Sequence, residues 1–335
     1  MSNRRDFLKV AATGAVVLGS QSKLALAGML DAQAESGKSR VVVAKDALLH
    51  GPAGNTTSKP DEKRVLALLD RAIASYTGID NQVEAWKHIV PAGKTIGLKT
   101  NGLGGRGIST HKALVEAVCE RMQQAGVKPG NIIVWDRNAR DLEACGLTIN
   151  TDPSRVRCFG SDVSGYEDQA VTFGSATVRL SKILTRECDM VIGLPILKDH
   201  ELAGVTFAMK NMYGVLSRPW DIHANGCNPG VADLNSIPVI REKVRFTIGD
   251  AMSSVYQGGP GFHPEYLWYP NTLIVGEDRV AVDHIALQMI ERKRAEAGLP
   301  ALEAAGRPAR YIATAADATH QLGVNDPARI HVMEV

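Results

Sequence analysis

The 335-residue sequence has few cysteines, few aromatic residues and no excess of either charge. Its five cysteines stand singly, without a Cys-x-x-Cys pair, which argues against an iron–sulfur cluster or a structural zinc knuckle. After residue 27, no apolar run is long enough to cross a bilayer, so no stable membrane span is expected.

The charge balance excludes two further classes of partner. Lys and Arg number 38 and Asp and Glu 36, and residues 1–27 hold four of the bases and one of the acids. The rest of the chain therefore has 34 bases and 35 acids. Proteins that bind nucleic acid or an anionic membrane surface usually carry a basic excess. We expect neither partner.

The first 27 residues have the order of an export signal. Arg4 and Arg5 precede a short uncharged run, residues 10–19, and a small-x-small cleavage site at residues 25–27. The paired arginines are typical of the twin-arginine route. The sequence thus predicts a twin-arginine signal peptide over residues 1–27, contact with the twin-arginine translocase during export, and a periplasmic or extracellular protein. Proteins on this route cross the membrane folded, often with a cofactor already inserted.

Residues 28–39 are small and polar and are expected to form a linker. Beyond them, apolar runs alternate with helical patterns. Strands are expected at 40–44, 94–100, 132–136, 189–195, 244–248, 272–276 and 330–335, and helices at 61–76, 112–125, 280–292 and after Gly204. This alternation predicts an α/β domain over residues 40–335, with a mostly parallel sheet flanked by helices, either as one body or as two lobes with the site between them. Ligands of such folds bind beside the carboxyl ends of the strands.

A glycine-rich segment follows the expected strand 94–100. Its backbone N–H groups and the charge of Lys99 would suit an anion, and Asn101 is a second candidate ligand-binding residue. Ser109 or Thr110 would cap the next helix and place His111 in its first turn, where the helix dipole favours a neutral imidazole that acts as a base. A flexible loop with a surface histidine is the alternative.

Residues 193–214 hold the densest cluster of polar side chains in an apolar stretch: Lys198, Asp199, His200, Lys210 and Asn211. Apolar neighbours of Lys210 disfavour its charged form, so this lysine is a candidate nucleophile or covalent anchor. The alternative is a lysine whose stem is buried and whose ammonium group reaches solvent.

Two later segments carry candidate metal ligands. Asp221, His223 and Cys227 lie in one turn-rich loop, which is either a ligand set or a loop held by side-chain turns. Asp250 ends an expected strand and would orient a base, bind metal or form a turn. Asp278 is expected to cap the helix that follows it.

Four stretches carry a family resemblance: residues 99–101, 195–214, 249–250 with 258–260, and 278–283. In them the chain resembles the bacterial and archaeal family called domain of unknown function 362, for which no reaction is established. Many members carry an appended ferredoxin-like module, and this chain lacks the cysteines of that module.

A more distant resemblance is to the nickel-pincer lactate racemases. It is carried by His200 with Ala203-Gly204, by Lys210 ten residues on, and by residues 109–112. By this resemblance, His111 and His200 would be bases acting on a 2-hydroxy acid and Lys210 would tether the pincer nucleotide. His200 and His223 would then be candidate ligands of nickel or another divalent metal.

Three functions follow as hypotheses. The first is an exported, cofactor-dependent enzyme that acts on a small anionic molecule, racemase- or epimerase-like on a 2-hydroxy acid, with catalytic residues His111, His200 and Lys210. Its cofactor would contact Lys99, Asn101, Lys198, Asn211 and Asp250. The second is a metal-dependent hydrolase whose ion is held by His200, His223, Asp199 and Asp250. The third is a non-catalytic periplasmic protein that binds a ligand or a partner.

Overall fold

The computed structural model of the chain describes residues 37–52 and 59–335. The predicted signal peptide, residues 1–27, lies outside the described residues, as does most of the predicted linker, residues 28–39.

Within the described residues, eleven strands form one sheet, eight of them in the order β13-β1-β12-β10-β7-β2-β3-β4. These eight are β1 (Ser39–Lys45), β2 (Ile96–Lys99), β3 (Ile132–Asp136), β4 (Arg157–Gly160), β7 (Met190–Gly193), β10 (Val244–Val255), β12 (Thr272–Gly276) and β13 (Ile330–Glu334). The other three are β8 (Ile196–His200), β9 (Gly204–Thr206) and β11 (Leu267–Trp268), joined through β10 and β8. A separate hairpin consists of β5 (Val171–Phe173) and β6 (Ala176–Val178).

The strands from β10 through β7, β2 and β3 to β4 pair in parallel, whereas β12 pairs antiparallel with both β10 and β1. The predicted mostly parallel α/β sheet is therefore confirmed. From β2 the chain proceeds outward through β3 to β4, and β7 and β10 then add on the opposite side of β2. Such a reversal of strand order opens a crevice at the carboxyl ends of the two central strands, which is the usual place for a ligand.

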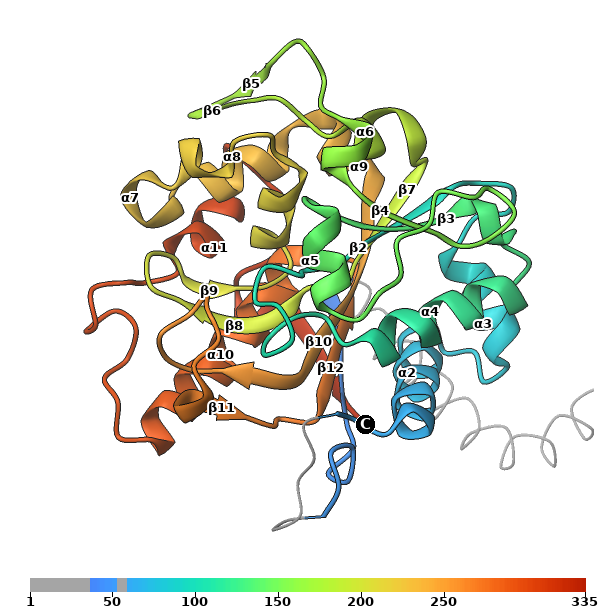
Figure 1. Ribbon diagram of the computed structural model, residues 1–335. Helices are drawn as coiled ribbons and strands as arrows, with labels where there is room; N and C mark the ends of the chain where they lie inside the picture. The colour runs from blue at the N-terminus through green and yellow to red at the C-terminus, as the bar shows by residue number, and fades with distance from the viewer. Residues whose placement is uncertain (1–36, 53–58) are drawn as a thin grey trace, which may run out of the picture. The chain divides into compact units, whose positions relative to one another are not determined.

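Helices cover both faces of the sheet (Figure 1). On one face lie α2 (Glu62–Thr77), α3 (Gln82–Ile89) and α4 (Lys112–Gln124), and on the other α8 (Gly230–Ser236), α9 (Pro238–Lys243), α10 (Arg279–Glu296) and α11 (Arg310–Ala315). Successive side chains of a strand point to opposite faces. Accordingly, Ile132 and Val134 join the core under α2 and α4, while Ile133 and Trp135 join the core under α8 and α10.

Shorter helical segments connect these elements. They are α5 (Ala139–Ala144), α6 (Ser161–Ser164), α7 (Ala224–Cys227), the 3₁₀ turns η1 (Pro129–Asn131), η3 (Lys210–Val215), η4 (Pro219–Ile222), η5 (Pro264–Tyr266) and η6 (Pro327–Arg329), and the π-helical turn η2 (Ile183–Glu187). Residues 40–335 form one compact unit. The single sheet, rather than a gap between two lobes, is what positions the polar residues.

The helix expected after Gly204 begins later than the sequence indicated. Gly204–Thr206 form β9, which pairs antiparallel with β8 so that Lys198 faces Thr206, and helical backbone begins only at Lys210. Gly204 has a φ of 76°, and a Cβ atom there would lie 2.6 Å from the carbonyl oxygen of Arg307. This glycine therefore serves the turn between two strands and a close approach to Arg307, not a helix.

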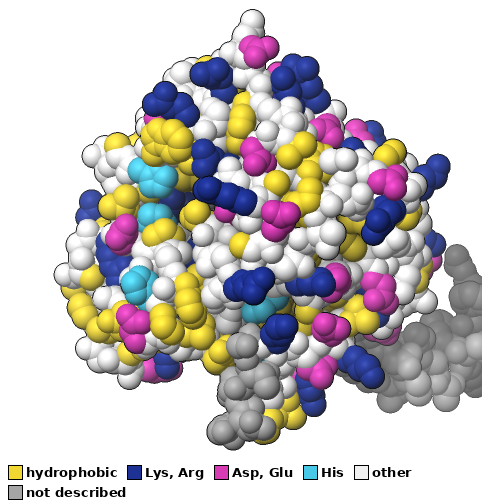
Figure 2. Space-filling view, in the orientation of Figure 1, with side chains coloured by type: hydrophobic (Ala, Val, Ile, Leu, Met, Phe, Trp, Pro, Cys, Tyr) yellow, Lys and Arg dark blue, Asp and Glu magenta, His cyan; other side chains and the backbone are white. Residues whose placement is uncertain are grey.

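On the face of the molecule drawn in Figure 2, basic and acidic side chains are interspersed. Among the described residues, no helix combines the length and the apolar character needed to cross a membrane.

Candidate functional site

A cavity of about 160 Å³ lies where β2, β3 and β8 end, beside the reversal of strand order between β2 and β7. Its lining includes nine ionisable side chains that the sequence spreads over more than 120 residues: Lys99, Asp136, Arg137, Asp141, Lys198, His200, Lys210, Tyr213 and His223. Asn101 and Asn211 also line it. The structure thus brings together most of the residues singled out in the sequence.

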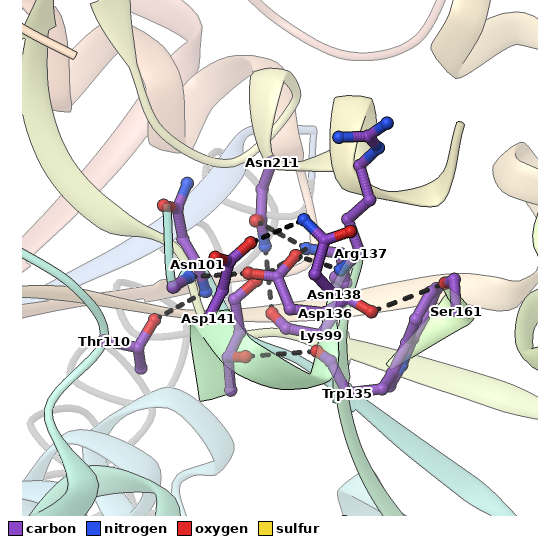
Figure 3. A network of polar contacts seen from close by, with 12 residues as sticks. Lys99, Asn101, Thr110, Trp135, Asp136, Arg137, Asn138, Asp141, Ser161 and Asn211 are labelled. Carbon is purple, nitrogen blue, oxygen red and sulfur yellow. Dashed lines mark hydrogen bonds and ion pairs between the residues drawn. The ribbon is translucent and has the colours of Figure 1, made fainter. Parts of the chain in front are cut away.

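Lys99 and Asp136 form a buried ion pair at one wall of the cavity (Figure 3). The Lys99 Nζ atom donates to Asp136 Oδ1 at 2.6 Å, to the Thr100 carbonyl at 2.6 Å and to Asn211 Oδ1 at 3.3 Å. These three acceptors engage all three ammonium protons. A Cβ atom on Gly214 would lie 2.5 Å from Lys99 Nζ, so glycine at this position leaves room for the pair. Lys99 is neutralised within the protein.

Lys198 has no such partner. Its side chain is fully buried, and its one hydrogen bond within the described residues is to Asn101 Oδ1, at 3.2 Å. Burial lowers the pKa of Lys198 to about 8. Lys198 and His200 are two residues apart on β8 and so share its cavity face, while Asp199 points the other way and binds Arg307 at 2.6 Å.

Lys210 occupies an apolar part of the cavity at the start of η3. Its Nζ atom lies 3.8 Å from the centroid of the Tyr213 ring and 3.4 Å from His223 Nε2. Burial lowers the pKa of Lys210 to about 8. The side chain does not reach solvent, because only 5% of the residue is exposed.

The hydrogen bonds of His200 assign its proton. Its Nδ1 atom lies 3.1 Å from the backbone N–H of Leu202 and 3.3 Å from that of Ala203, and a nitrogen that accepts from N–H donors carries no proton itself. Burial, reinforced by the charges of Lys210 and Lys198, lowers the pKa of His200 to about 2, so the ring is neutral. Its Nε2 atom therefore carries the proton and is a hydrogen-bond donor.

His223 has the opposite tautomer. Its Nδ1 atom lies 2.8 Å from the carbonyl oxygen of Pro219, which can only accept, so the proton is on Nδ1. Burial lowers the pKa of His223 as well, and its Nε2 lone pair faces Lys210. The rings of His200 and His223 are 6.1 Å apart between centroids and inclined by 30°. The site therefore holds one neutral imidazole that donates and one that accepts.

His111 and Asp250 are not brought into the lining of this cavity. Both the Nδ1 atom and the backbone N–H of His111 lie 2.8 Å from Asp250 Oδ2, and Ser253 Oγ lies 3.3 Å from His111 Nε2. His111 is itself the residue before α4, without a side-chain cap, so the predicted caps are wrong. Thr110 Oγ1 instead donates a hydrogen bond to the Leu194 carbonyl oxygen, 2.6 Å away. This contact ties the glycine-rich loop to the residue that follows β7.

Residues 96–288 match the model of one protein family, described as domain of unknown function (DUF362). The chain belongs to this family. Two solved structures are similar to it at low identity. One is a protein from Thermotoga maritima, with 11% identity and a TM-score of 0.41, covering 72% of this chain and 60% of that one. The other is the lactate racemase apoprotein from Thermoanaerobacterium thermosaccharolyticum, with 10% identity and a TM-score of 0.34, covering 73% and 55%.

The DUF362 protein thus spans about three fifths of the length of the first of these chains and little more than half of the second. No curated protein matches it. The likeness to a lactate racemase that the sequence indicated is present as weak structural similarity.

Of the four metal ligands proposed for the DUF362 protein, His200 and His223 line the cavity and Asp199 and Asp250 do not. Asp199 is bound by Arg307, Asp250 by His111, and His200 has its Nδ1 atom committed to backbone donors. A metal on Nε2 of His200 would move the ring proton to Nδ1, against those two donors. Among residues 37–52 and 59–335, no group of three or more His, Cys, Asp or Glu side chains is placed to hold a metal ion.

A pincer nucleotide fits the site no better. Lys210 is an available amine, but the cavity of about 160 Å³ is smaller than the roughly 300–1,000 Å³ that drug-sized ligands occupy. The residues present suit a molecule of a few carbon atoms.

Several lining residues were not singled out in the sequence. Asp136 ends β3 next to Lys99, and a polar residue at the end of a hydrophobic strand was the available signal. Arg137 follows it and also lines the cavity. The hydroxyl of Thr206 has no hydrogen-bond partner among the described residues, although it is buried in this lining. Nothing local in the sequence marks Thr206, since its position depends on the pairing of β9 with β8.

Proposed function

We propose that this DUF362 protein is an enzyme that binds a small anionic substrate in the cavity and transfers a proton on it, in the manner of an isomerase or racemase. The observation that carries the proposal is the pair of neutral histidines with opposite tautomers, His200 and His223, which line the same cavity as Lys210.

Uncompensated positive charge supports an anionic substrate. Lys198 and Lys210 are both buried, and neither forms an ion pair with a carboxylate among the described residues. The nearby Asp136 is already engaged by Lys99. A buried charge is costly unless it is paired, so an anion that enters the cavity gains two favourable interactions and relieves the repulsion between the two lysines.

The two histidines supply acid–base chemistry. His223 Nε2 is the proton acceptor, since its lone pair points into the site and Pro219 holds the other nitrogen protonated. His200 Nε2–H is the donor that stabilises negative charge on a substrate oxygen while the proton is away. A small hydroxy- or oxo-carboxylate carries both the anionic group and an acidifiable carbon, and a 2-hydroxy acid is the first substrate class to test.

The test is proton exchange on a panel of short 2-hydroxy and 2-oxo acids incubated with the protein in D₂O and followed by NMR and polarimetry. We expect exchange at one carbon, lost in His200→Gln and in His223→Gln. His284, which contacts Asn325 and Gln288 outside the cavity, provides the matched control as His284→Gln. If both cavity variants exchange at the wild-type rate, the proposal is wrong.

We also propose that the protein is exported by the twin-arginine route, on the strength of Arg4 and Arg5 before the short uncharged run. Changing both arginines to lysine is expected to leave the unprocessed protein in the cytoplasm, as followed by cell fractionation. Equal export of the variant and the wild type would contradict this.

A further inference from the structure

Three lysines line the cavity, and their surroundings give them different chemistry. Lys99 donates three hydrogen bonds and has no lone pair to offer. Lys198 donates to Asn101 and lies on β8 beside β9. Lys210 rests against the face of the Tyr213 ring and, of the three lysines, is the one beside a nitrogen that accepts protons. Lys210 is therefore the lysine whose amine has a neighbouring base.

We infer that the Lys210 amine forms a Schiff base with the carbonyl carbon of a small 2-oxo acid. This rests on the proposed function, because it requires the same cavity to bind an anion. An amine in an apolar site next to a base is the arrangement that activates lysine for attack on carbonyl groups.

The local base is His223. Its Nε2 atom lies 3.4 Å from Lys210 Nζ, and the Pro219 carbonyl keeps the Nε2 lone pair available by holding the proton on Nδ1. Burial lowers the pKa of Lys210 to about 8. Near neutral pH about a tenth of the Lys210 side chains are then uncharged, compared with less than about a thousandth for an ordinary lysine.

Lys198 and Thr206 form a binding site for the carboxylate of the substrate. Lys198 and Thr206 face each other across β8 and β9, so their side chains share one face of the hairpin. Lys198 has ammonium protons to spare, and the Thr206 hydroxyl is without a partner among the described residues. A carboxylate between them would satisfy both groups and leave the adjacent carbonyl for Lys210.

The volume of the cavity limits the length of the acid. Its volume of about 160 Å³ is below the roughly 300–1,000 Å³ of pockets for drug-sized ligands. Short 2-oxo acids are therefore the ones to test first.

The chemistry balances without an oxidant or a metal. The Lys210 nitrogen bonds to the carbonyl carbon, the carbonyl electron pair moves to oxygen, and His223 relays a nitrogen proton to that oxygen. The resulting hydroxyl group takes a second proton, delivered from solvent through His223, and leaves as water, so that a C=N bond protonated on nitrogen remains. His200 Nε2–H hydrogen-bonds the oxygen during the attack without giving up its proton. In acids of three or four carbon atoms, His223 next takes a proton from the carbon beside the C=N bond, which forms an enamine, and returns it in the reverse step. Glyoxylate has no such proton and stops at the C=N bond.

The experiment is reductive trapping of the full chain. The protein is incubated with glyoxylate or pyruvate and sodium borohydride, and the modified peptide is identified by mass spectrometry. We expect one reduced adduct, on Lys210, with trapping that rises through about pH 8 as the amine loses its proton. Lys210→Arg and Lys210→Gln are expected to give none, with folding checked by circular dichroism.

Two controls separate site-directed from general reactivity. Lys112 is half exposed on α4 and reports non-specific modification in the same sample. Lys198→Gln keeps the amine but loses the carboxylate contact, so it should require about tenfold or more oxo acid for the same trapping. Equal labelling of Lys112 and Lys210 would overturn the inference.

A parallel melting experiment distinguishes failure of the inference from failure of the proposed function. A 2-hydroxy acid would bind the same carboxylate site but has no ketone or aldehyde carbonyl for Lys210 to attack. If hydroxy and oxo acids both raise the melting temperature and no adduct forms, the Schiff base is wrong and the anion site stands. If neither acid raises the melting temperature and no adduct forms, both proposals fail.

Discussion

The Nε2 atom of His223 lies 3.4 Å from the Nζ atom of Lys210. The contact depends on the turn η4, because the Pro219 carbonyl at its start fixes which nitrogen of His223 carries the proton. A buried amine and a proton acceptor are thereby held together without any carboxylate.

The first prediction concerns this contact. His223→Gln removes the proton acceptor but keeps a polar side chain, so we expect proton exchange on the substrate to fall by about 10²–10⁴-fold. Anion affinity should change little, because Lys198 and Lys210 remain. Exchange is measured by NMR and affinity by equilibrium dialysis. A parallel loss of affinity and rate would instead indicate a binding role for His223.

The second prediction is a pH dependence of stability that arises from His200. Its pKa is about 2 in the folded protein and near 6.5 when unfolded, so below the latter value the unfolded chain takes up a proton that the folded chain does not. Stability is therefore lost as the pH falls below about 6.5, by up to about 1.4 kcal/mol per pH unit.

The substitution His200→Gln removes this pH-dependent contribution to stability. Urea denaturation should show the stability advantage of the wild type over the variant shrinking by about 2 kcal/mol between about pH 7 and about pH 5. Burial raises the pKa of Asp283 to about 7, which has the opposite sign, stabilising the protein at lower pH in the same window. Because Asp283 is present in both proteins, its contribution to the free energy of unfolding cancels in the difference between them. A difference that stays constant with pH would show that the pKa of His200 is the same in the folded and the unfolded chain.

The third prediction concerns the buried pair of Lys99 and Asp136. Asp136→Asn leaves the Lys99 ammonium group uncompensated, and this should lower the free energy of unfolding by about 3–5 kcal/mol. The exposed pair of Lys87 and Glu84 is the matched control, for which Glu84→Gln should cost less than about 1 kcal/mol. Denaturant unfolding measures both. Comparable costs would mean that water reaches Lys99.

The fourth prediction separates His111 from the cavity. Asp250 accepts hydrogen bonds from the backbone and ring of His111 and from the Met252 N–H, so Asp250→Asn should lower stability by about 2 kcal/mol. Anion affinity of the cavity should be unchanged. Loss of exchange activity at wild-type stability would place His111 in the catalytic machinery after all, as the sequence resemblance implies.

The fifth prediction is the effect of metal removal. Because no group of three or more candidate ligands among the described residues is placed to hold a metal ion, we expect anion binding and trapping at Lys210 to survive dialysis against a chelator. Metal analysis before and after dialysis accompanies the assay. Loss of trapping that nickel or zinc restores would show that a metal takes part.

Much of the fold could be predicted because its signals are local. The hydrophobic strands 132–136 and 272–276 and the periodic helix at 61–76 match the structure to within a residue or so. Asp278 caps α10 as expected, accepting the N–H groups of Val280 and Ala281. The hairpin of β8 and β9 could not be read in this way, because its stability comes from pairing and burial rather than from a hydrophobic pattern.

The candidate site was only partly predictable. Lys198, His200 and Lys210 stood out as polar residues in apolar sequence, and the structure places them in one cavity. His111 and Asp250 stood out by the same kind of reasoning and lie in a different cluster. Residue type and spacing cannot separate these cases, because the direction of a side chain depends on which strand its loop contacts.

By itself, the sequence determined the α/β class, the family and the kinds of chemistry available, because these follow from periodicity and from residue type. Only the tertiary structure decided which lysine is neutralised and which is not. Lys99 meets Asp136, 37 residues away, while Lys210 meets an imidazole lone pair instead. The difference arises because electrostatic compensation in a buried site depends on distances of a few ångströms, and the folded chain sets those distances.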